Sequence, residues 1–157
     1  MDLSLPKVSD IISVPHEDGS RSYAVILYGP DKNGVILLGV FENEYESVEQ
    51  VSCHFDSLIY TYDVSILDGE WKIVGTLQLS DYDKYSRRIV RGNAWEGDTC
   101  FGAALSPQTE SFPERLVAGT GAASKYLHFL IKGGTERAFF RINSKAMKAL
   151  LKTLNQT

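Results

Sequence analysis

The sequence contains few of the residues that most often build catalytic and metal sites. Among its 157 residues there are two cysteines and three histidines. Cys53 and Cys100 lack CxxC spacing, so we expect reduced thiols rather than a disulfide scaffold. A GxSxG elbow, an HExxH pair and a calcium-loop spacing are also missing. We therefore expect no enzymatic activity, no metal and no cofactor.

Long apolar runs and an excess of positive charge are missing too. No run approaches the roughly 20 apolar residues of a membrane span, and no basic start precedes an apolar block at the N-terminus. We expect a cytoplasmic protein with no membrane partner. The formal net charge is −4, whereas phosphate binding needs clustered lysine and arginine, so nucleic acid is not an expected partner. A basic protein partner would suit this charge.

The patterns that are present predict a single α+β domain over residues 1–157. The C-terminus is amphipathic, with Met147, Leu150 and Leu154 at helical spacing after the candidate N-cap Ser144. We predict a bent, mostly antiparallel sheet, partly barrel-like, with this helix packed against it. The β-like runs lie at residues 8–14, 22–28, 35–41, 57–62, 67–79, 89–90 and 99–105.

The stretch 67–79 has the clearest strand pattern. After the turn pair Asp68-Gly69, apolar or small residues alternate with a second set on a two-residue period. This alternation predicts one apolar face, with Trp71 as a core anchor. The apolar set is Trp71, Ile73, Gly75, Leu77 and Leu79, and the second set is Glu70, Lys72, Val74, Thr76 and Gln78.

Residues 116–142 are compatible with two structures. The runs 126–131 and 137–142 flank a glycine-containing turn, which favours a hairpin, and the alternative is a helix capped by Gly133. We predict the hairpin. Gly119 to Ser124 resembles a phosphate-binding loop in its glycines, but it lacks the final glycine and the lysine of that motif. A plain loop is the preferred interpretation.

Cys53, His54 and Asp56 form one candidate for catalysis. His54 and Asp56 would share a side in an extended chain, as two metal ligands or as a base and its orienting group. Cys53 would be a thiol nucleophile, but neighbours in a strand point to opposite sides. No third ligand pattern accompanies them, so we prefer a structural interpretation.

The most acidic stretch, residues 42–50, is the main candidate for a partner-binding surface. Its carboxylates would steer a basic partner, and Tyr45 would add contact area. The alternative is a solvated connection. Asp81 and Asp83 lie in a second charged loop, which is a weaker candidate and is more often simply solvated. The candidate partner-binding residues are Glu42, Glu44, Tyr45, Glu46, Glu49, Asp81 and Asp83.

Several short sequences between about residues 8 and 80, half of the chain, resemble the immunity protein 26 family. They are Ile11–Pro15, Ser22–Ile26, Phe41 at the end of the next strand, and Asp68–Gly75 with its G-x-W-x-x-x-G step. The resemblance implies an antidote encoded beside a bacterial polymorphic toxin. Such a protein binds and neutralises its cognate toxin by steric and electrostatic occlusion and is not an enzyme. The family does not supply interface residues, and the chain from Ser80 onward does not match it.

Two other functions stay open. One is a small-ligand or protein-interaction module with a cleft near Tyr60, Tyr62 and Trp95. The other is the hydrolase centred on Cys53, which we consider less favoured than either binding function.

Overall fold

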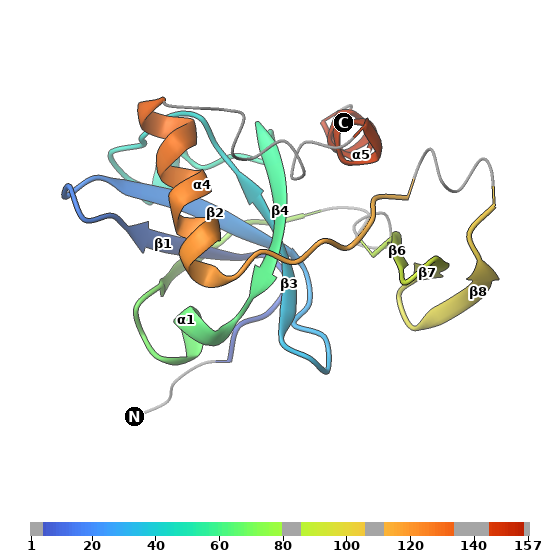
Figure 1. The fold of residues 1–157 in the computed structure, drawn as a ribbon. Helices are drawn as coiled ribbons and strands as arrows, with labels where there is room; N and C mark the ends of the chain where they lie inside the picture. The colour runs from blue at the N-terminus through green and yellow to red at the C-terminus, as the bar shows by residue number, and fades with distance from the viewer. Residues whose placement is uncertain (1–4, 80–85, 106–111, 134–144, 156–157) are drawn as a thin grey trace.

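The computed structural model arranges the chain as two antiparallel sheets with a few helices (Figure 1). It describes residues 5–79, 86–105, 112–133 and 145–155. The strands are β1 (Asp10–Pro15), β2 (Arg21–Tyr28), β3 (Val35–Val40), β4 (Ser57–Tyr62), β5 (Lys72–Thr76), β6 (Arg88–Val90), β7 (Asn93–Glu96) and β8 (Thr99–Ala103). The helices are the 3-10 helix η1 (Val48–Gln50), α1 (Val64–Leu67), α4 (Thr120–Lys132) and α5 (Lys145–Leu154). The predicted α+β class is confirmed.

The main sheet has five strands in the order β4-β3-β2-β1-β5, and each neighbouring pair is antiparallel. The predicted hairpin is its centre, because β2 and β3 pair directly, with Ala24 opposite Val40. The turn formers between Gly29 and Gly34 connect the two strands. The outer strands β4 and β5 do not pair with each other, so the sheet is not closed into a barrel.

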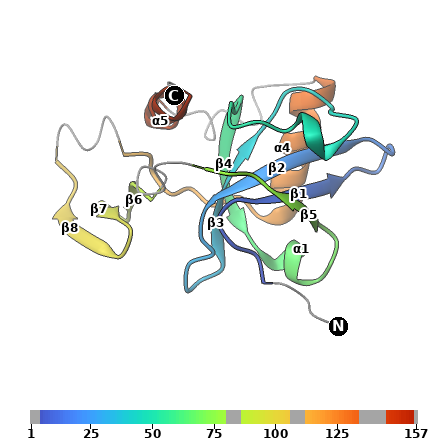
Figure 2. The same ribbon diagram turned by 180° about the vertical axis from the view of Figure 1, so that it is seen from behind.

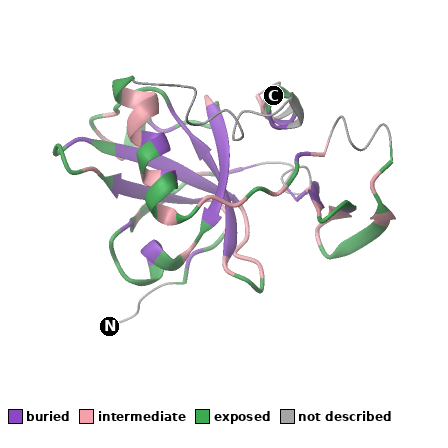
Figure 3. Cartoon of the chain, viewed as in Figure 1, coloured by how far each residue is buried: buried purple, intermediate pink, exposed green. Residues whose placement is uncertain are grey.

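Both faces of the main sheet are buried, because successive side chains of a strand point to opposite sides (Figure 3). The neighbours Ile11 and Ile12 illustrate this, since each is buried in a different core. The α4 core comprises Ile12, Val14, Ala24, Ile26, Ile36, Leu38, Val40, Ile59, Ile66, Trp71, Ala123, Tyr126 and Leu127. The α5 core comprises Ile11, Tyr23, Val25, Leu27, Val35, Leu37, Phe41, Val51, Phe55, Leu58, Tyr60, Leu79, Met147 and Leu150.

Helix α4 lies across one face of the main sheet, and it corrects the prediction of a hairpin at 126–131 (Figure 1). Ala123, Tyr126 and Leu127 recur at helical spacing and are buried against the sheet. The Tyr126 hydroxyl also hydrogen-bonds the hydroxyl of Ser57. Gly133 ends the helix with φ of 82° and donates its N–H to Phe129 O. Residues 137–142, the other half of that hairpin, lie outside the described residues.

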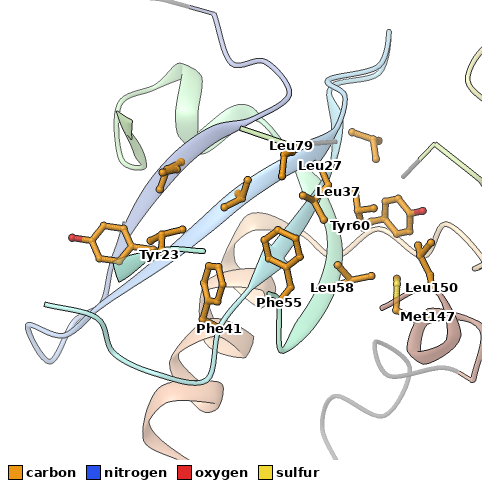
Figure 4. Close-up of a cluster of buried hydrophobic side chains, with 14 residues drawn as sticks. Tyr23, Leu27, Leu37, Phe41, Phe55, Leu58, Tyr60, Leu79, Met147 and Leu150 are labelled. Carbon is orange, nitrogen blue, oxygen red and sulfur yellow. The ribbon is translucent and has the colours of Figure 1, made fainter. Parts of the chain in front are cut away.

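The opposite face is covered by α5 and by residues 41–55 (Figure 4). Phe41 and Phe55 pack with their ring centroids 5.6 Å apart. Phe55 rests on β3 at Gly39, where an added Cβ would lie 2.5 Å from the ring. Met147 and Leu150 of α5 complete this core, which confirms the predicted C-terminal helix. Its candidate N-cap, Ser144, lies outside the described residues.

Strand β5 and the residues on either side of it contribute to both cores because of a bulge. Its partner β1 pairs Ile11 with Gly75 but Ile12 with Ile73, so Val74 is an extra residue in the ladder. Trp71 and Ile73 therefore pack in the α4 core, while Leu77 and Leu79 pack in the α5 core. The burial of Trp71 is as predicted, but the predicted apolar set divides between the two cores instead of forming one apolar face. Figure 2 shows β5 at the edge of the main sheet, beside β1.

The second sheet, in the order β6-β7-β8, stands to one side of the main sheet (Figure 1). Arg88 of β6 connects the two sheets, with its guanidinium 4.7 Å from the centroid of the Tyr28 ring and 5.7 Å from the Trp95 ring. Arg115 forms a second connection, because its backbone N–H donates to Ile89 O of β6 at 2.9 Å while its side chain forms an ion pair of 2.6 Å with Asp31 of the β2–β3 loop. Cation–π stacking and one short ion pair thus join the small sheet to the body of the protein.

Candidate functional site

The acidic segment, residues 42–50, is a fixed feature of the surface. Its four glutamates, Glu42, Glu44, Glu46 and Glu49, are all exposed. Tyr45 is half-buried, and its ring packs edge-on against Phe41 at a centroid distance of 5.3 Å. Val48 also packs against the α5 core. The apolar residues of this segment point inward while the carboxylates point to solvent.

Backbone hydrogen bonds hold both ends of the acidic segment. At its start, the N–H of Glu42 donates to Asp56 Oδ2 at 2.9 Å. At η1, Gln50 Oε1 accepts the N–H of Glu46 at 2.6 Å and that of Ser47 at 3.2 Å. The carboxylates therefore project from a backbone whose conformation is set by its own contacts.

Glu44 differs from the other glutamates because it binds α4. Its carboxylate lies 2.9 Å from Lys132 Nζ and also accepts the backbone N–H of Arg21. The hydrogen bond from Lys132 is the main cause of the lowered pKa of Glu44, and it raises the pKa of Lys132 in turn. Both groups are exposed, so the pair contributes little to stability. It nevertheless connects the acidic segment to the C-terminal end of α4.

A histidine cluster lies beside this connection, between the β1–β2 turn and α4. The rings of His16 and His128 meet edge-on at a centroid distance of 5.0 Å. His128 Nε2 lies 2.8 Å from Asp18 Oδ2, and His16 Nε2 lies 2.8 Å from the hydroxyl of Ser22. The Ser22 hydroxyl also donates to Leu127 O of α4, at 3.4 Å.

Burial and neighbouring charge shift the pKa values of this cluster. Burial is the largest cause of the lowered pKa of His16, and the nearby His128 lowers it further. Asp18 and Glu44 oppose that shift. The pKa of Asp18 is itself held well below its usual range, first by the Ser20 hydroxyl and then by His128. A neutral His16 and an ionised Asp18 are thus the favoured forms in the folded protein.

The α4 groove opens next to the histidine cluster and has a volume of about 930 Å³. This volume falls within the range of small-molecule sites in proteins. Most of its lining residues carry polar or charged side chains, and they come from the end of β1 and the β1–β2 turn, from α1 and the connection to β5, and from α4. The lining residues are Pro15, His16, Glu17, Asp18, Ser65, Glu70, Trp71, Thr120, Gly121, Ser124, Lys125 and His128.

One side of α4 supplies a polar stripe to this groove. Gly121, Ser124, Lys125 and His128 recur at i, i+3, i+4 and i+7, which places them on one helical face. The preferred interpretation of 119–124 as a plain loop is therefore wrong for 120–124, because these residues form the first turn and a half of α4. Gly119 is the N-cap and has no side chain with which to cap the helix.

Within the described residues, no hydrogen bond or ion pair joins Cys53, His54 and Asp56 to one another. Cys53 and His54 are exposed, and Cys53 Sγ donates to Gln78 O at 3.4 Å. Asp56 accepts the backbone N–H of Glu42 and so has a structural contact. No group of three or more metal-ligating side chains occurs within the described parts of the chain. Asp81 and Asp83 fall in residues 80–85, which lie outside those parts.

The aromatic residues proposed to form a cleft do not line the α4 groove. Tyr60 is fully buried, its hydroxyl has no hydrogen-bond partner among the described residues, and burial raises its pKa above the usual range. Tyr62 is 40% exposed at the end of β4, and Trp95 stacks with Arg88 at the junction of the sheets. The groove has a different aromatic residue, Trp71, in its wall.

Sequence reasoning did not identify His16, Asp18 and His128 as a site. Asp18 and His128 are 110 residues apart in the chain, and no short motif contains them both. One usable signal was the polar turn 16–20, which carries a histidine and an aspartate between two apolar strands. The other was the polar stripe on 121–128, which becomes visible only if that stretch is interpreted as a helix.

The fold and these sites were compared with known proteins. No family model, curated protein or solved structure matches the chain. In addition, no helix in the described parts is long and apolar enough to cross a membrane. The candidate function therefore has to be argued from the molecule's own surface chemistry and from the resemblance in its N-terminal half.

Proposed function

We propose that the protein is a non-enzymatic immunity protein that binds and neutralises a cognate bacterial toxin, with the acidic segment as its docking surface. The observation that carries this proposal is the combination of exposed glutamates with a backbone held by its own contacts. The four glutamates point to solvent, while Tyr45 and Val48 anchor the segment to the α5 core. The proposed location is the cytoplasm, where such a toxin would act on its host.

A backbone that is fixed before binding favours association, because less conformational entropy is lost when the complex forms. An interface loop that is already in its bound conformation loses less conformational entropy when the partner arrives. Here hydrogen bonds at Glu42, Glu46 and Ser47 set the backbone of the acidic segment before any partner binds. The side chains of Glu42, Glu46 and Glu49 remain to be ordered, whereas Glu44 is already held by Lys132 and Arg21.

The partner's expected chemistry follows from the same surface. Exposed carboxylates attract a basic protein over a distance comparable to the Debye length and so raise the rate of association. Glu42, Glu46 and Glu49 form no ion pair with other described residues, so their charge is available to a partner. Neutralisation would then come from covering the toxin's active site, without a chemical step.

The first experiment is co-expression with the product of the neighbouring upstream gene in a bacterial host. We expect a stable complex that co-purifies and restores growth when that product is toxic. Toxicity without a complex and without rescue would refute the immunity function.

A second experiment tests the docking surface itself. The variant Glu46→Lys with Glu49→Lys is expected to slow association about tenfold at low salt, with a smaller effect at high salt. The matched control is Asp98→Lys with Glu114→Lys, which makes the same charge change at exposed positions on the small sheet and the segment that leads to α4. Equal association rates for the two double variants would remove the acidic segment from the interface. Unfolding midpoints establish that both variants fold.

A further inference from the structure

We infer that the α4 groove is a binding site for a small zwitterion of the peptide class, a ligand with a free ammonium group and a free carboxylate. The inference is independent of the toxin-binding proposal, because it concerns a different surface and a different kind of ligand. It starts from the volume of the groove, about 930 Å³, which is enough for a short peptide.

Charges of opposite sign line the groove without pairing with each other. Glu17 comes from the β1–β2 turn, Glu70 from the α1–β5 connection and Lys125 from α4. None of the three forms an ion pair with a described residue. By contrast, Asp18 already has a partner, because its Oδ2 lies 2.8 Å from His128 Nε2. The groove therefore presents carboxylates from two elements and an ammonium from a third, and none of these groups is paired with another charged group in the described parts of the chain.

A ligand with a single charge fits this lining less well than a zwitterion. An anion would be attracted by Lys125 and repelled by the two glutamates. A cation would be attracted by the glutamates and repelled by Lys125. A zwitterion can place its ammonium near Glu17 and Glu70 and its carboxylate near Lys125, so both ends gain a charge-assisted hydrogen bond. Hydroxyl groups of Thr120 and Ser124 on the same face of α4 are further donors for a carboxylate.

The polarity of α4 supports the same orientation. Its first residues, Thr120 and Gly121, line the groove, and the N-cap Gly119 provides no capping side chain. The positive end of the helix dipole therefore adds to the charge of Lys125 at the proposed carboxylate end. Trp71 supplies an aromatic wall and also a spectroscopic reporter.

The test uses three peptides of the same sequence whose termini differ in charge. Triglycine carries both charges, N-acetyl-triglycine carries only the carboxylate, and triglycine amide carries only the ammonium. Binding is followed by Trp71 fluorescence in the Trp95→Phe background, at millimolar peptide and constant ionic strength. We expect saturable binding of triglycine with an affinity about tenfold or more above that of either singly charged peptide.

Variants then assign each end of the ligand. Lys125→Gln is expected to weaken the binding of triglycine and N-acetyl-triglycine but not that of triglycine amide. Glu70→Gln is expected to weaken the binding of triglycine and triglycine amide but not that of N-acetyl-triglycine. Lys148→Gln on α5 and Glu114→Gln are exposed controls away from the groove and should leave binding unchanged. Absence of saturable binding, equal affinity for the three peptides, or insensitivity to Lys125→Gln would each overturn the inference. Because no toxin is present, its failure would leave the toxin-binding proposal unaffected.

Discussion

Protonation of single side chains should make the stability of this protein depend on pH. His16 is partly buried beside His128, and its pKa is lowered from 6.5. Between the folded and unfolded pKa values the unfolded chain binds more protons, so the free energy of unfolding rises with pH through that window. The contribution of His16 to the free energy of unfolding is complete above pH 6.5 and is lost as the pH falls through its lowered pKa. Asp18 and Glu44, whose pKa values are lowered, act in the same direction at lower pH.

We therefore predict that His16→Gln flattens the pH dependence of unfolding between about pH 7.5 and pH 5.5. The glutamine cannot gain the proton that His16 gains on unfolding. Urea unfolding at both pH values measures this difference. His54→Gln, at an exposed position, is the matched control and should retain the wild-type dependence. A wild-type slope in the His16 variant would show that another group is responsible.

Trp71 gives a prediction about packing. It is 4% exposed and belongs to the α4 core, so Trp71→Ala should lower the free energy of unfolding by about 3–5 kcal/mol. Val74→Ala in the same strand is the control, because Val74 is 41% exposed and its truncation should change stability by about 0.5 kcal/mol or less. Chemical denaturation compares the two, and similar small losses would place Trp71 outside the core.

Among the elements, α5 and residues 41–55 share a core and are also joined by one side-chain amide. Asn155, just beyond α5, accepts the N–H of Phe55 at 3.0 Å and donates to Phe55 O at 2.8 Å. These two bonds imitate a short piece of β-ladder. They hold the chain that follows the acidic segment against the end of the C-terminal helix.

Asn155→Ala removes both of these hydrogen bonds and should destabilise the protein by about 1–3 kcal/mol. Asn155→Asp keeps the acceptor for the Phe55 N–H but loses the donor, so its stability should lie between wild type and Asn155→Ala. Thermal or urea unfolding measures the order of the three proteins. If Asn155→Ala is as stable as wild type, the two bonds are exchanged for water without a net cost.

Local patterns predicted some of these elements well and others poorly. The β2–β3 hairpin follows from turn formers between two apolar runs, and α5 follows from its apolar spacing. Helix α4 could not be predicted from a local pattern, because residues 126–131 suit either a strand or a buried helix. Its contacts with the sheet, such as Tyr126 with Ser57, are 69 residues apart in the chain.

The acidic segment and the α4 groove also differ in how far the sequence could predict them. The acidic segment could be predicted because its glutamates are contiguous in sequence, although nothing in the sequence showed that Glu44 would pair with Lys132, 88 residues away. The α4 groove could not be predicted, because it requires three elements to meet. Single-sequence reasoning detects a site when its residues are neighbours in the chain, and it has no access to residues that only the fold brings together.

For the molecule as a whole, the main sheet lies between two cores, with α4 packed on one face and α5 on the other. In such an arrangement the two cores could unfold separately if each strand contributed side chains to only one of them. The inner strands already contribute to both cores through their alternating side chains. At the edge, β5 does so only because Val74 interrupts the ladder and reverses the direction of the side chains that follow.

The bulge in β5 therefore has a consequence for hydrogen exchange. Edge strands usually exchange their amide protons by local fraying, at a lower free energy than global unfolding. Here Trp71 and Ile73 are held in one core while Leu77 and Leu79 are held in the other. We predict that the Leu77 amide, which donates to Ser9 O, exchanges with the same free energy and denaturant dependence as amides of β2. Exchange at a lower free energy would show that the edge frays; equal values would mean that both cores unfold as one cooperative unit.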